Sequence, residues 1–67
     1  MYYTQNHAQV GTRNIWHYLL DSEVGQVHIV QYEKPGKELE TFLYYYNNEK
    51  AERKFKSLVK RMVEGKI

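Results

Sequence analysis

The sequence has no cysteine and a single proline among its 67 residues. Without cysteine, disulfides and thiolate metal sites are excluded. No apolar run approaches the roughly 18 residues that a transmembrane helix requires. The first residues, MYYTQNHAQVG, have neither the basic start nor the apolar core of a secretory signal. We therefore expect a soluble, cytoplasmic protein with no cofactor and no membrane partner.

The short length of the chain limits the size of its hydrophobic core. A domain of this size buries only about 60% of the surface that its unfolded chain exposes. Disulfides are excluded, and three histidines are few for a structural metal site. Aromatic residues make up 15% of the chain, which argues against disorder. Self-association is the simplest further source of stability.

The order of local patterns predicts an α+β domain. Three segments have strand character and are separated by turn sequences, DSEVGQ and KPGK: RNIWHYLLD (13–21), QVHIVQYE (26–33) and LETFLYYY (39–46). We predict a three-stranded antiparallel meander followed by one C-terminal amphipathic helix packed on one sheet face (β-β-β-α). Residues 1–13 form an N-terminal arm, either flexible or added as an edge strand, and residues 14–67 form a single α+β domain.

The helix has the clearest signal. One apolar stripe recurs at helical spacing through Ala51, Phe55, Leu58, Val59, Met62 and Val63. Asn47 or Asn48 is the expected N-cap. Glu49 suits the first turn and Lys60 the last, because the helix dipole favours acid at the start and base at the end.

The triplet Tyr44–Tyr46 places tyrosine on both faces of its strand. If Asp21 pairs with Gln26 and Lys34 with Lys37, Ile29 lies opposite Phe42. One face then holds Trp16, Tyr18, Leu20, Val27, Ile29, Phe42, Tyr44 and Tyr46. The other holds Ile15, His17, Leu19, His28, Val30, Tyr32, Leu39, Thr41, Leu43 and Tyr45. A slip of one residue would exchange these sets.

Both sets are largely apolar, and one helix covers one face. We assign the helix to the Trp16 face, because the other face carries more groups that tolerate water. The uncovered face then predicts a protein interface made of His17, His28, Val30, Tyr32, Thr41, Leu43 and Tyr45. Its expected occupant is a second copy, giving a homodimer, or another protein. Alternatively, residues 1–13 fold back over it.

His17 and His28 share a face in this register. A metal site needs further ligands, and catalysis needs an orienting carboxylate and a nucleophile. Neither is present on that face. We therefore predict no catalytic or metal site and expect a protein that is not an enzyme.

The helix segment is basic. The segment from Glu49 to Lys66 contains seven basic residues and three acidic residues. The outward side predicts a contact for nucleic acid or an acidic partner through Lys50, Arg53, Lys54, Lys60 and Arg61, with an ordinary solvated surface as the alternative. The element order is similar to that of plant DNA-binding domains and integrase arm-binding domains that lay a sheet in the major groove. Those domains carry arginines on their strands, and here Arg13 alone is near one.

The sequence favours a small non-enzymatic interaction protein of the regulator or inhibitor type, which self-associates or binds a protein partner. A nucleic-acid-binding protein is the alternative hypothesis. By analogy of class, a phage- or plasmid-encoded inhibitor of a host system is a third.

Overall fold

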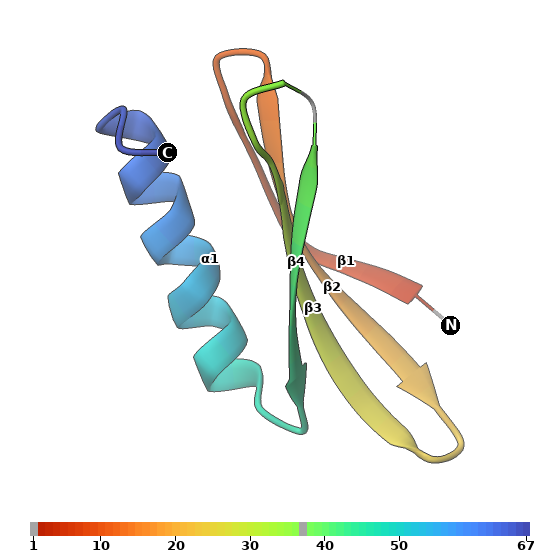
Figure 1. The fold of residues 1–67 in the computed structure, drawn as a ribbon. Coiled ribbons are helices and arrows are strands. Elements are labelled where there is room, and N and C mark those ends of the chain that lie inside the picture. Colours follow the sequence, from red (N-terminus) through yellow and green to blue (C-terminus); the bar gives the residue numbers. More distant parts are fainter. Residues whose placement is uncertain (1, 37) are drawn as a thin grey trace.

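The fold is a four-stranded antiparallel sheet with one helix across it. The structure is a computed structural model, which describes residues 2–36 and 38–67. The strands run β1 (Tyr2–Val10), β2 (Arg13–Ser22), β3 (Gly25–Glu33) and β4 (Leu39–Tyr45), and the helix α1 spans Asn48–Val63. The sheet order is β1-β2-β3-β4. Figure 1 shows the sheet nearly edge-on, with α1 on one side of it.

Strand β1 corrects the predicted strand number. The sequence predicted three strands and left the first residues as an arm or an added edge strand. In the structure they are an edge strand, antiparallel to β2, with Val10 opposite Arg13 across the two-residue connection Gly11–Thr12. The pairing shifts between Thr4 and Asn6, so that Gln5 is an extra residue, or bulge.

The predicted register is right for one hairpin and wrong for the next. Asp21 pairs with Gln26, as predicted. In the β3–β4 pair, however, Ile29 lies opposite Leu43 and not opposite Phe42. The expected partner of Lys34, Lys37, lies outside the described residues. A shift of one residue exchanges the faces of β4.

The face that α1 covers is the reverse of the one predicted. Ile15, Val30 and Tyr32 are buried against the helix, where they form the core with Ala51, Leu58 and Met62. Phe42 and Tyr44 pack against this core, because the true register turns them to this side. This side is the helix-covered face below, and the opposite side is the open face.

Helix α1 begins as predicted. The side chain of Asn47 accepts a hydrogen bond from the backbone N–H of Lys50 at 3.1 Å and caps the first turn. Glu49 lies in the first turn, and Lys60 and Arg61 lie in the last, in agreement with the helix dipole.

The residue after β4, Tyr46, bonds to the β2–β3 hairpin. Tyr46 has a φ of 54°, and its backbone N–H donates to the carbonyl of Gln26 at 3.1 Å. Its hydroxyl donates to the carbonyl of Val24 at 2.6 Å. A Cβ on Gly25 would stand 1.7 Å from that hydroxyl oxygen. Glycine at this position therefore allows the tyrosine to close the end of the hairpin.

Candidate interaction surfaces

The open face is apolar and aromatic across its centre. Strand alternation and register place twelve residues across its centre: Tyr2, Thr4, His7, Trp16, Tyr18, Leu20, Val27, Ile29, Gln31, Thr41, Leu43 and Tyr45. This central set contains no Asp, Glu, Lys or Arg. Among the described strand residues, the one acid on this face is Glu33 at the end of β3, which accepts a hydrogen bond from the Asn14 amide at 2.7 Å. Leu43 is 51% exposed and Tyr45 is 67% exposed. In the part of the chain that the structure describes, α1 is the single helix, and it lies on the other side (Figure 1).

A shallow groove crosses the centre of the open face. Its volume is about 410 Å³, and its lining comes from all four strands: Tyr2, Thr4, Tyr18, Ile29, Gln31, Thr41 and Leu43. The amide of Gln31 donates to the hydroxyl of Thr41 at 3.0 Å. These two polar side chains thus partner each other, and the rest of the groove is largely aliphatic and aromatic.

Stacked rings support one half of this face. The rings of His7 and Trp16 lie 6.0 Å apart, and those of Trp16 and Tyr18 lie 6.4 Å apart. Such spacing is typical of favourable aromatic pairs. The three side chains make a continuous row over β1 and β2, in which each ring packs against the next.

The structure divides the predicted interface set. Thr41, Leu43 and Tyr45 are exposed on the open face. His17, His28, Val30 and Tyr32 are instead buried beneath α1 and are not available to a partner. The prediction failed at these four because the helix was assigned to the opposite face, on the argument that their face carries more groups that tolerate water. Here His17, His28 and Tyr32 instead find protein partners. Sequence reasoning missed Tyr18 and Ile29 because it assigned the helix to their face, although it paired these two residues correctly.

The two buried histidines satisfy each other. His17 Nε2 and His28 Nδ1 are 3.0 Å apart, and the amide nitrogen of Asn6 lies 3.0 Å from His17 Nδ1. With Asn6 as donor, His17 accepts at Nδ1 and donates from Nε2 to His28. Burial lowers the pKa of His17, and the neighbouring His28 lowers it further, while Glu52 opposes this change. Among the described residues no cluster of three His, Cys, Asp or Glu side chains has a geometry for a metal ion.

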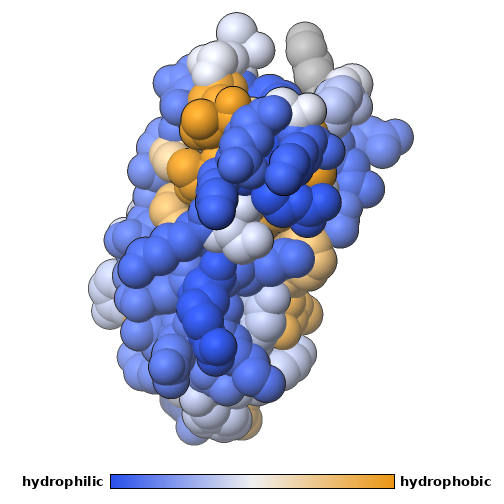
Figure 2. Space-filling model, turned by 90° about the vertical axis from the view of Figure 1, so that its left-hand side faces the viewer, coloured by the Kyte–Doolittle hydropathy of each residue, from blue (hydrophilic) through white to orange (hydrophobic). Residues whose placement is uncertain are grey.

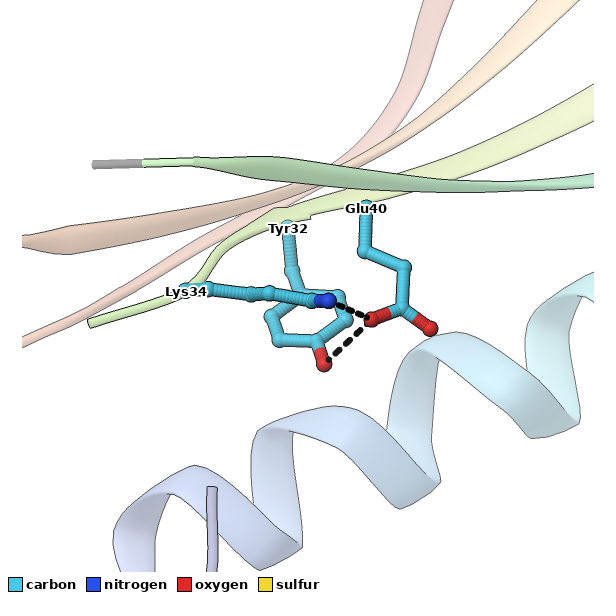
Figure 3. A network of polar contacts seen from close by, with 3 residues as sticks. All are labelled: Tyr32, Lys34 and Glu40. Carbon is cyan, nitrogen blue, oxygen red and sulfur yellow. Dashed lines mark hydrogen bonds and ion pairs between the residues drawn. The ribbon is translucent and has the colours of Figure 1, made fainter. Parts of the chain in front are cut away.

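The hydroxyl of Tyr32 is satisfied by a second polar network (Figure 3). It donates to Glu40 Oε2 at 3.2 Å, and Lys34 Nζ lies 2.7 Å from the same oxygen. The hydrogen bond from Lys34 lowers the pKa of Glu40. Burial, and then the bond to Glu40, raises the pKa of Tyr32. Tyr32 therefore remains neutral, and the single charge of Glu40 is balanced by Lys34.

The basic residues of α1 divide between two directions. Lys50 and Lys54 turn toward β4, where they line a shallow hollow of about 360 Å³ with Tyr44 and Arg53. Lys54 Nζ lies 4.2 Å from the centre of the Phe42 ring. Lys60 and Arg61 are exposed in the last turn. Figure 2, which looks at the helix side, shows hydrophilic side chains over most of this surface.

The helix is too short and too polar to cross a membrane, and it is the one helix of the described residues. A scan against protein-family models, a search of curated proteins and a search of solved structures found no match to this chain. The geometry of its surfaces is therefore the basis for a functional conclusion.

Proposed function

We propose that this protein is a small non-enzymatic interaction protein that self-associates through the open face of its sheet. The supporting observation is the composition of the centre of that face: twelve described side chains across four strands, none of them charged, with the acid Glu33 at the end of β3 bonded to Asn14. Burial of apolar surface stabilises by about 25 cal/mol per Å². A sheet face of this kind is usually covered in a folded protein.

A second copy is the occupant that this face fits best. In a two-fold dimer each residue set meets itself, so any charge on the surface would face a like charge or need a complement. The centre of the open face has none to repel, and Glu33 lies at the end of β3, away from that centre. Two such sheets pack at about 10 Å with their strands about 30° apart. The product is a helix–sheet–sheet–helix sandwich with a shared core, which compensates for the small core of each chain.

Light scattering after size-exclusion chromatography tests this proposal. We expect a dimer whose dissociation is visible somewhere between about 1 µM and about 1 mM, the range of weak to moderate association. Raising the salt from about 0.1 M to about 1 M should leave the dimer intact, because apolar contacts are not screened. A monomer at every concentration would refute self-association.

Two matched variants locate the interface. Leu43→Lys adds a charge at the centre of the open face, where the wild-type side chain is 51% exposed, so the monomer should still fold. Val63→Lys adds the same charge on α1, at a side chain that is 68% exposed. We expect Leu43→Lys to be monomeric and Val63→Lys to remain dimeric. A dimer in both variants would place the contact elsewhere.

A further inference from the structure

We infer that the hollow between α1 and β4, lined by Tyr44, Lys50, Arg53 and Lys54, is a binding site for single-stranded nucleic acid. This hollow, called the α1–β4 groove here, has a volume of about 360 Å³. It opens on the helix side of the sheet. The open face is on the other side, so this site is independent of the dimer contact.

The cations of the groove form a line. Lys50 and Lys54 are four residues apart and therefore lie on the same side of α1. Arg61, seven residues beyond Lys54, continues the line, which spans about 16 Å at 1.5 Å per residue. Among the described side chains, Lys50, Arg53, Lys54 and Arg61 form no ion pair within 4 Å. Four positive charges are thus free to contact phosphates.

Acidic residues are few on this side of the helix, where Glu49 lies one turn before Arg53. Glu52 is directed to the opposite side, where it accepts from Gln5 at 3.4 Å. The acid of β4 that lies nearby, Glu40, is neutralised by Lys34 at 2.7 Å. The helix flank toward β4 is therefore cationic, although the net charge of the chain is only +2.

Aromatic rings lie among these cations. Tyr44 is half-buried and forms part of the wall of the groove, and the Phe42 ring lies beneath Lys54 Nζ at 4.2 Å. A cationic groove with an accessible ring is the arrangement that binds single strands, because phosphates contact the cations while an unpaired base stacks on the ring. A duplex offers phosphates but no free base. An acidic protein segment would use the cations and not the ring.

Fluorescence anisotropy with a labelled single strand of about 20 nucleotides tests the site. We expect the logarithm of the binding constant to fall with the logarithm of salt at a slope of about −2 to −3, from three or four phosphate contacts at about −0.7 each. The double variant Lys50→Gln/Lys54→Gln should reduce the slope by about 1.4 and weaken binding at least about tenfold at low salt.

The control variant is Lys56→Gln/Lys60→Gln, which removes the same charge from the same helix but outside the groove. We expect it to weaken binding less than about threefold, as a change in net charge alone does at a distance. Equal losses in the two double variants would show attraction by net charge only and would overturn the site. Absence of binding by the wild type at about 50 mM salt would overturn it as well.

Tyrosine substitutions test the base contact. Tyr44→Leu keeps an apolar side chain on the helix-covered face but removes the ring, and should weaken single-strand binding about tenfold. Tyr45→Leu changes the neighbouring residue on the open face and should leave binding unchanged. If duplex or polyglutamate bound as tightly as the single strand, or if Tyr44→Leu had no effect, the groove would not be a single-strand site.

Discussion

Gly25 and Tyr46 show how one missing side chain allows another to be placed. The Tyr46 ring occupies the space that a Cβ on Gly25 would take, and Gly25 itself has a φ of 134°. Glycine adopts such angles without strain. The tyrosine in turn joins the end of β4 to the β2–β3 hairpin through the carbonyl of Val24. A larger side chain at position 25 should therefore displace the Tyr46 ring and weaken its hydrogen bond to Val24.

Gly25→Ala should therefore lower the free energy of unfolding by about 2 to 4 kcal/mol, since it combines backbone strain with displacement of Tyr46. Gly11→Ala is the control. Gly11 also has positive φ, at 64°, but a Cβ there would meet nothing within 4 Å. Its cost should be about 1 kcal/mol, from backbone strain alone. Equal costs in urea unfolding would contradict the role of Tyr46.

His17 should make stability depend on pH. Burial and His28 lower its pKa below the usual 6.5. The unfolded chain then binds a proton that the folded chain does not, so the free energy of unfolding decreases as pH falls below about 6.5, toward the folded pKa. Above about pH 6.5 this contribution is fully present.

Thermal melts at about pH 7.5 and about pH 5.5 measure the effect. We expect the wild type to lose stability at the lower pH, and His17→Gln to lose less between the two conditions, whatever its stability at the higher one. Exposed His7 provides the control, because His7→Gln should retain the wild-type difference. A wild-type difference undiminished in His17→Gln would exclude His17 as its source.

At the scale of the element, α1 decides which sheet face is core. Leu58 is 1% exposed beneath the helix, whereas Leu43 is 51% exposed on the open face. Leu58→Ala should cost about 2 to 5 kcal/mol, as truncations in a packed core do. Leu43→Ala, measured in urea at a concentration where the protein is monomeric, should cost less than about 1 kcal/mol. The opposite order would contradict the observed packing of α1.

The helix could be predicted from sequence, and the sheet only in part. The helical stripe and the Asn47 cap are local signals, and both are correct except at Val63, which is 68% exposed. The predicted register of β4 failed because of a loop length. A tight turn places two residues between paired neighbours, but Glu33 pairs with Leu39, so five residues lie between them. Changing an even loop to an odd one turns every β4 side chain to the other face.

Strand β1 was left open for a different reason. Its nine residues, YYTQNHAQV, show no apolar alternation, because it is an edge strand and six of its nine residues are exposed. What fixes it is pairing with β2 and the bond between Gln5 and Asn48 at 2.8 Å, a contact across 43 positions of sequence. The candidate surfaces depend on the same long-range placement. The basic residues of α1 were visible in the sequence, but the position of Tyr44 beside them required the β4 register.

At the scale of the whole molecule, stability and association should be linked. A dimer that forms from folded chains stabilises them by mass action, so the melting temperature rises with protein concentration. We expect a rise of several degrees between about 5 µM and about 500 µM, because a free-energy gain of 1 kcal/mol shifts the midpoint of a domain this small by about 4–8 °C. Leu43→Lys should melt at one temperature throughout. A concentration-independent wild type would contradict the linkage.

The order of the sheet has a consequence for how the chain folds. Each strand pairs with its neighbour in sequence, β1 with β2, β2 with β3 and β3 with β4. Each pairing therefore closes a short loop, which keeps the contact order low for a protein dominated by a sheet. The hairpins can form on the microsecond scale without the helix. We therefore expect the docking of α1, whose contacts with β1 span the longest separations, to be a late step in folding.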